Sequence, residues 1–129
     1  MTALAAYLSY RDAKSALAWL EAVGFTPTTV QEGEGDAITH AELTLGDVVV
    51  MVASFDAEYQ VPPLEGQSTG AGLYLVVDDV QAIYDRAVEA GATSVFAPEQ
   101  TEWGTWRARV LDPEGREWSF GTYAPGQSW

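Results

Sequence analysis

The sequence predicts an α+β fold built from two successive modules, each made of a strand, a helix and three further strands. Two pairs of residues at one offset indicate this repeat. Asp12 and Asp79, which suit the N-cap of a helix, lie 67 residues apart, and so do Gly24 and Gly91, which suit its end. With 129 residues and 47% apolar content, the chain is long enough to bury a conventional core.

The first module, at about residues 1–54, shows its elements in order. An apolar and aromatic run at 4–10 predicts the first strand. Asp12 then suits an N-cap, and helical spacing gives the following segment one apolar face, formed by Leu17, Leu20 and Val23. Runs of apolar and β-branched residues predict the other three strands, at 25–30, 39–45 and 48–53.

A linker at about residues 55–70 separates the modules, because prolines and glycines interrupt the pattern there. The second module, at about 71–129, begins with a strand at 72–77. Its helix follows Asp79 and has an apolar face formed by Val80, Ile83, Tyr84, Ala87 and Val88. A closing hairpin joins strands at 106–111 and 116–123 through the turn sequence Asp112-Pro113-Glu114-Gly115.

Composition excludes several classes of function. Six Lys and Arg against 19 Asp and Glu give a net charge of −13, which disfavours nucleic acid and anionic membranes as partners. No cysteine is present, and the single His excludes the common metal sites that pair two histidines of one chain. No apolar run approaches the length of a membrane span, and the N-terminus lacks the features of a signal peptide. We therefore expect a cytoplasmic protein.

Four stretches of the chain resemble one protein family. They are the closing hairpin at 111–123, Val77-Asp78-Asp79-Val80 at the start of the second helix, Glu89-Ala90-Gly91-Ala92 at its end, and His40-Ala41-Glu42-Leu43. Together with the repeat they resemble the vicinal-oxygen-chelate superfamily, which includes glyoxalases, extradiol dioxygenases and bleomycin-resistance proteins. The resemblance implies two βαβββ modules whose curved mixed sheets form a ligand cavity. It also implies a bacterial protein that forms homodimers.

The positions that bind metal in this family hold other residues here. The family draws its ligands from the first and last strand of each module. Counting from the capping aspartates and the turn glycines places these positions at Ala5, Val50, Gly72 and Ser119. One hydroxyl and three groups without a donor atom do not hold a divalent cation. We therefore expect neither a metal ion nor any other cofactor.

Strand alternation sorts the remaining side chains into two faces. Leu8, Tyr10, Val49, Met51, Leu73, Leu75, Val77, Trp118 and Phe120 are expected to pack on the helices. The other face is expected to line the cavity, with Tyr7, Ser9, His40, Glu42, Tyr74, Glu117 and Ser119. Trp103 and Trp106 are expected at its rim, together with Phe55 and Tyr59. As an alternative, the two glutamates pair with Arg107 and Arg109.

Three functions fit this cavity. The first is metal-free binding of a small organic molecule, cationic or aromatic, as in drug-sequestering proteins of antibiotic resistance, because aromatic faces and carboxylates attract such ligands. The second is a glyoxalase-like lyase or isomerase that uses His40 and Glu42 in proton transfer. The third is a regulatory or partner-binding module whose cavity is vestigial.

Overall fold

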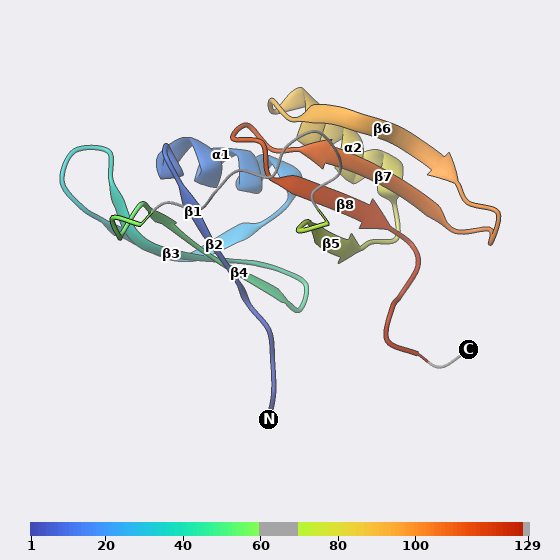
Figure 1. Ribbon diagram of the computed structural model, residues 1–129, viewed down its shortest axis with the longest axis horizontal. Coiled ribbons are helices and arrows are strands. Elements are labelled where there is room, and N and C mark those ends of the chain that lie inside the picture. The colour runs from blue at the N-terminus through green and yellow to red at the C-terminus, as the bar shows by residue number, and fades with distance from the viewer. Residues whose placement is uncertain (60–69, 128–129) are drawn as a thin grey trace. The chain divides into compact units, whose positions relative to one another are not determined.

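The computed structural model describes residues 1–59 and 70–127, and the chain divides into two compact units, Met1–Val61 and Pro62–Trp129 (Figure 1). The first unit contains β1 (Ala6–Tyr10), α1 (Ala13–Val23), β2 (Thr26–Glu32), β3 (Ile38–Leu45) and β4 (Val48–Ser54). The second contains β5 (Leu73–Val76), α2 (Val80–Glu89), β6 (Thr93–Gln100), β7 (Trp106–Leu111) and β8 (Glu117–Gly121). The predicted α+β fold of two βαβββ modules is confirmed.

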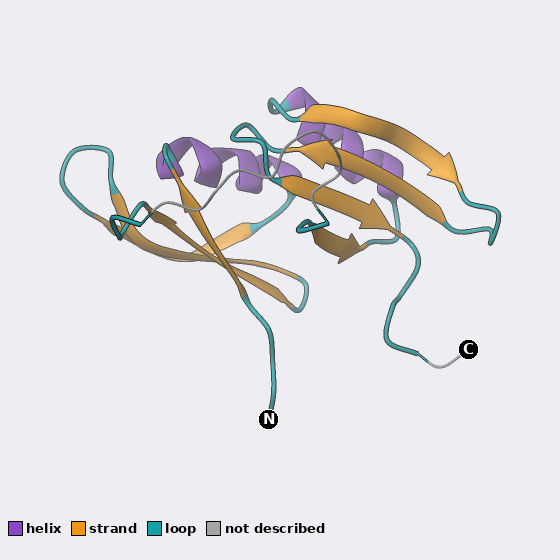
Figure 2. Ribbon diagram, in the orientation of Figure 1, coloured by secondary structure: helices purple, strands orange, loops and turns teal. Residues whose placement is uncertain are grey.

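Each unit folds its four strands into one mixed sheet. The strand orders are β1-β4-β3-β2 and β5-β8-β7-β6, so the first strand of each module lies beside the last. That pair is parallel and the other pairs are antiparallel. In each unit the helix covers one face of its own sheet (Figure 2). We call the opposite face the open face. It carries Tyr7, Ser9, His40, Glu42 and Met51 in the first unit and Tyr74, Arg107, Arg109 and Ser119 in the second.

Both helices begin at the predicted aspartates. Asp12 accepts hydrogen bonds from the amide of Ser15 at 3.1 Å and from its hydroxyl at 2.7 Å, and Asp79 accepts one from the amide of Ala82 at 3.0 Å. The Ser15 hydroxyl is the main cause that lowers the pKa of Asp12, because it stabilises the carboxylate form. α1 ends at Gly24, whose φ of 133° is open to glycine but strained for other residues.

The core of each unit lies between its helix and its sheet. In the first unit Leu20 and Val23 of α1 are fully buried with Leu43 and Val52 of the sheet. In the second unit Ile83 and Ala87 of α2 are buried, and so are sheet residues Val110, Trp118 and Phe120. Burial alternates along β1, β5 and β8 as expected, and the predicted helix-facing residues of these strands are the more buried ones.

The closing hairpin of the second unit is organised by one buried carboxylate. Asp112 is only 3% exposed. Its Oδ1 accepts from the amides of Glu114 and Arg116, each at 3.0 Å, and its Oδ2 accepts from Nε1 of Trp118 at 3.1 Å. A single side chain therefore holds both the turn and a core tryptophan, which explains why an aspartate at this position is tolerated inside the fold.

The expected register of β4 is wrong. Val50 and Val52 are buried and lie opposite the core residues Leu43 and Ala41, whereas Val49 is exposed and Met51 is partly exposed. The error arises because the two hairpins end on opposite faces of their sheets, although each turn glycine lies two residues before the next strand. β4 begins with Val48 opposite Leu45, which shares the helix-facing side with Leu43. β8 begins with Glu117 opposite Leu111, which shares the open face with Arg109. Counting from the glycines therefore shifts one strand by a residue, and this exchanges its two faces.

Strand pairing gives the correct correspondence between the modules. Tyr7 lies opposite Met51, as Tyr74 lies opposite Ser119. Glu42 also lies opposite Met51, as Arg109 lies opposite Ser119. Met51 therefore corresponds to Ser119. In the same way Glu42 corresponds to Arg109, and His40, two residues earlier, corresponds to Arg107. The same two open-face positions carry a His–Glu pair in one sheet and two arginines in the other.

Candidate functional site

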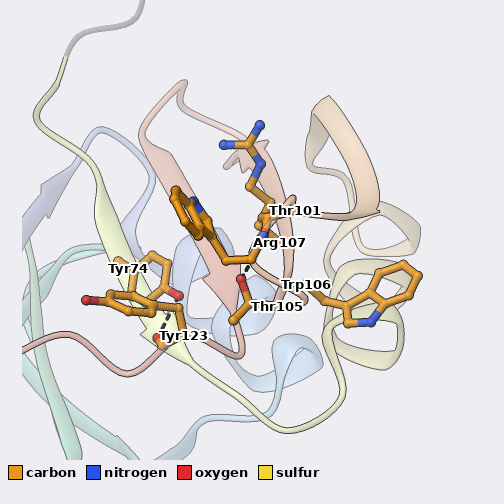
Figure 3. A pocket seen from close by; sticks show the side chains of 7 residues that line it. Tyr74, Thr101, Thr105, Trp106, Arg107 and Tyr123 are labelled. Atoms are coloured by element: carbon orange, nitrogen blue, oxygen red, sulfur yellow. Dashed lines mark hydrogen bonds between the residues drawn. The ribbon is translucent and has the colours of Figure 1, made fainter. Parts of the chain in front are cut away.

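A pocket of about 470 Å³ lies at one end of the second sheet (Figure 3). Four of its seven lining residues are aromatic, and only one is charged. The lining consists of Tyr74, Thr101, Trp103, Thr105, Trp106, Arg107 and Tyr123. These residues come from β5, from the loop between β6 and β7, from the start of β7 and from the segment after β8. All seven residues belong to the second unit.

The β6–β7 loop supplies one wall of the pocket. The amide of Thr101 donates to the carbonyl of Thr105 at 2.7 Å, and the hydroxyls of these threonines lie 2.8 Å apart. Gly104 has a φ of 86°, which closes the short loop at little cost because glycine has no Cβ. The loop presents Trp103 with 79% of its surface exposed. An apolar ring of this size at a pocket wall is available for contact with a ligand.

Tyr74 and Tyr123 form the opposite side (Figure 3). The Tyr74 hydroxyl donates to the Tyr123 carbonyl at 2.8 Å, and burial raises the pKa of Tyr74. The tyrosine ring crosses β8 at Gly121, where a Cβ would overlap the hydroxyl and lie 2.8 Å from Cζ. Gly121 is therefore required by this ring and not by its own backbone conformation.

Trp106 is a lining residue of two cavities. In Figure 3 its indole points away from Tyr74 and Tyr123. Trp106 also lines a smaller cavity of about 280 Å³ with Pro98, Thr122 and residues 78–81 at the start of α2. The amide of Trp106 donates to the Thr122 hydroxyl at 2.9 Å, and its carbonyl accepts from the Thr122 amide at 3.0 Å. These bonds fix the position from which the indole extends.

The predicted residues of the second module fall into two groups. Tyr74, Trp103 and Trp106 line the pocket, whereas Glu117 and Ser119 are not among its lining residues. Ser119 accepts from Nε of Arg109 at 2.9 Å. Glu117 lies beside β5, since its Oε2 would be 3.2 Å from a Cβ built on Gly72. The proposed partner of the glutamates, Arg107, instead pairs with Glu99 at 2.8 Å.

Four lining residues are not among those that the sequence pattern predicts: Thr101, Thr105, Arg107 and Tyr123. The threonines belong to a loop that has no periodic pattern. The sequence pattern predicts Tyr123 in the last strand, but β8 ends at Gly121 and the chain then turns toward Tyr74. The alternation of β7 was a usable signal for Arg107, because its neighbour Ala108 is buried.

The predicted residues of the first module share the open face of the first sheet. Nε2 of His40 lies 2.7 Å from Oε2 of Glu42. The Tyr7 hydroxyl donates to Oδ2 of Asp56 at 2.6 Å, and this hydrogen bond raises the pKa of Tyr7. Ser9, two residues after Tyr7 on β1, is partly exposed on the same face. Tyr7 and Tyr74 thus make corresponding contacts, each with a residue 49 positions later in the chain.

The sequence matches the Glyoxalase/Bleomycin resistance protein/Dioxygenase superfamily over residues 4–120. The chain belongs to this superfamily. An uncharacterized protein of Mycobacterium bovis is 32% identical over 124 residues, which cover 92% of this chain and 82% of that protein. An uncharacterized protein of Mycobacterium tuberculosis has the same identity, with 73% of its length covered.

Two solved structures have the same fold. The crystal structure of TioX from Micromonospora sp. ML1 is 30% identical, with a TM-score of 0.76 over 96% of this chain and all of that one. The crystal structure of a bleomycin resistance determinant encoded on the transposon Tn5 is 22% identical, with a TM-score of 0.63 over 94% of this chain and 97% of that one. At that identity the second comparison concerns the fold alone.

The superfamily's metal positions in this chain do not suit a divalent cation. With the corrected register they are Ala5, Met51, Gly72 and Ser119. A thioether and a hydroxyl are poor ligands for such an ion. Within residues 1–59 and 70–127, no three His, Asp or Glu side chains gather closely enough to hold a metal. The same residues include no helix that is long and apolar enough to cross a membrane.

Proposed function

We propose that this chain is a small-molecule binding protein that holds a flat aromatic ligand in the pocket of its second module. The observation that carries the proposal is the lining of that pocket, with Tyr74, Trp103, Trp106 and Tyr123 around a volume of about 470 Å³. This volume lies in the range of roughly 300–1,000 Å³ that is typical of small-ligand sites. Rigid aromatic walls with a few polar anchors bind planar molecules without any bond chemistry.

The lining favours an aromatic ligand over a simple cation. Arg107 is the charged lining residue, and its guanidinium stands 5.0 Å from the centre of the Phe96 ring and 2.8 Å from the Glu99 carboxylate. A ligand cation finds no carboxylate partner among the lining residues, whereas an aromatic ring can stack on the guanidinium. The hydroxyls of Thr101 and Thr105 supply polar anchors at the loop. An open pocket of this kind also supports ligand binding over a vestigial cavity.

Sequestration of a drug, as in antibiotic resistance, is the role that best fits binding without catalysis. It requires a pocket and affinity, and it needs neither a metal ion nor a nucleophile. The fold shared with the Tn5 bleomycin resistance determinant supports this role as part of the proposal.

Replacing Trp103 with Ala tests the proposal. We expect the affinity for the neutral probe 2-naphthamide to fall about tenfold, since one stacked aromatic contact contributes about 1–3 kcal/mol. Isothermal titration calorimetry measures the change. Val95→Ala is the control, because Val95 is exposed on β6 but does not line the pocket. Failure of the native protein to bind the probe, or equal affinity in the Trp103→Ala variant, would refute the proposal.

A second candidate function is proton transfer in a lyase or isomerase reaction, and the His40–Glu42 contact favours it. At 2.7 Å the carboxylate orients the imidazole, which is the arrangement of a general base with its orienting group. Both side chains are partly exposed on the open face and so are accessible to a substrate.

If this candidate is right, we expect the native protein to turn over the hemithioacetal of methylglyoxal and glutathione. The change in absorbance of the reaction mixture measures the rate. His40→Ala should lower the rate about 100-fold or more, the usual contribution of a general base. Glu42→Gln should lower it less, because the imidazole remains. Thr39→Ala is the control, since Thr39 is an exposed neighbour on β3. No turnover by the native protein, or full turnover by the His40→Ala variant, excludes this candidate.

A further inference from the structure

We infer that the open face of the second sheet contains an anion subsite, built from Arg109 and Ser119, that binds a carboxylate carried by the aromatic ligand. The inference rests on the proposed function, because the subsite is argued as an extension of the aromatic pocket. It names the ligand class as an aromatic carboxylic acid.

Arg109 is held in place by two contacts that leave its binding groups available. Its Nε donates to the Ser119 hydroxyl at 2.9 Å, and its guanidinium carbon lies 5.4 Å from the centre of the Phe96 ring. Neither contact uses the two terminal amino groups. A guanidinium fixed at Nε and supported on an aromatic face is well prepared to bind a planar oxyanion through two parallel hydrogen bonds.

The charge of Arg109 is not compensated by an ion pair in the part of the chain that the structure describes. Its neighbour Arg107 stands over the same Phe96 ring but pairs with Glu99 at 2.8 Å. No carboxylate among residues 1–59 and 70–127 lies within 4.0 Å of the Arg109 guanidinium. The carboxylate of Glu117 is directed toward Gly72, immediately before β5, whereas Arg109 is on β7, on the other side of β8.

The subsite is next to the aromatic pocket. Arg107 lines that pocket, and Arg109 follows it by two residues on the same face of β7, a separation of about 7 Å. A carboxylate attached directly to a fused ring system spans this distance. The overall charge of −13 does not prevent such binding, because charges beyond about 8–10 Å are screened while the guanidinium acts at contact distance.

The comparison between modules supports a dedicated role for this position. Arg109 corresponds to Glu42 of the first sheet, and Arg107 to His40. In the first sheet these positions hold a His–Glu pair at 2.7 Å. In the second sheet both guanidinium groups stand over the Phe96 ring, and among the described residues only that of Arg107 is paired with a carboxylate. Like charges side by side are unfavourable unless something binds them, and a ligand carboxylate relieves that repulsion.

The experiment compares 2-naphthoate with its uncharged amide, 2-naphthamide, by isothermal titration calorimetry. The native protein should bind the naphthoate about tenfold more tightly, the effect of one charge-assisted hydrogen-bonded pair. Arg109→Gln should abolish this preference and change the affinity for the amide by less than twofold. Arg86→Gln on α2 is the matched control, because it removes one positive charge from the other side of the sheet and should keep the preference.

Ser119→Ala provides a second variant that keeps the charge but removes the acceptor for Nε, and it should lower the preference several-fold. Equal affinity of the native protein for both probes, or an unchanged preference in the Arg109→Gln and Ser119→Ala variants, overturns the inference. Those outcomes leave the proposed aromatic pocket intact as long as 2-naphthamide binds. Absence of amide binding counts against the pocket instead, whereas a naphthoate affinity that depends on Arg109 still supports the subsite.

Discussion

Replacing Asp112 with Ala is expected to lower the free energy of unfolding by about 3–5 kcal/mol. The carboxylate is 3% exposed and accepts hydrogen bonds from the amides of Glu114 and Arg116 and from Nε1 of Trp118. Removing it takes this acceptor from all of these donors, one of which is on a buried tryptophan. Each buried unsatisfied donor costs about 1–3 kcal/mol.

Denaturation in urea, followed by tryptophan fluorescence, measures this loss. Asp47→Ala is the matched control, because Asp47 lies in the corresponding hairpin turn of the first module but is exposed, and we expect a change within about 0.5 kcal/mol. Asp112→Asn should have an intermediate effect. Its side-chain oxygen still accepts a hydrogen bond, but the new NH2 group replaces the other oxygen and faces one of the N–H donors. A loss below about 1 kcal/mol for Asp112→Ala would contradict the role given to this network.

Gly121→Ala is expected to lower the affinity for 2-naphthamide at least tenfold. The added Cβ would overlap the Tyr74 hydroxyl, so the ring must leave β8 and lose its hydrogen bond to the Tyr123 carbonyl. This displacement removes one wall of the pocket. Overpacking of this kind also lowers the free energy of unfolding by about 1–3 kcal/mol.

Calorimetric titration with the probe measures the affinity, and thermal unfolding shows whether the variant remains folded. Gly33→Ala is the control, since its added Cβ approaches the Thr39 hydroxyl oxygen in the first unit and affects no residue of the pocket. Unchanged affinity in a folded Gly121→Ala variant would mean that the Tyr74 ring does not shape the site.

The fold was predictable because its signals are local and repeated. Asp12 and Asp79 each cap the helix that follows them directly in the chain. Their 67-residue offset can be read from the sequence without any knowledge of tertiary structure. The register of β4 was not predictable from the turn glycines. A glycine marks a position with a positive φ, but it does not specify on which face of the sheet the next strand begins, and β4 and β8 begin on opposite faces.

The candidate site was predictable only where side chains belong to regular strands or are conspicuous by type. Tyr74 follows from alternation, and Trp103 and Trp106 follow from their size and their place before the closing hairpin. The anchoring of Tyr74 on the Tyr123 carbonyl depends on where the chain goes after β8, which no periodic pattern specifies. The ion pair of Arg107 with Glu99 required the β6–β7 register, and this contains two irregularities.

The two corresponding tyrosine contacts differ in how they withstand mutation. Tyr7 donates to a side chain, so almost any substitution of Asp56 removes the acceptor. Tyr74 donates to a main-chain carbonyl, which every residue type at position 123 retains. The segment after β8 can therefore change its residue at position 123 and still accept the hydrogen bond from Tyr74 of β5. The corresponding segment after β4 keeps its hydrogen bond to Tyr7 only while position 56 carries an acceptor side chain.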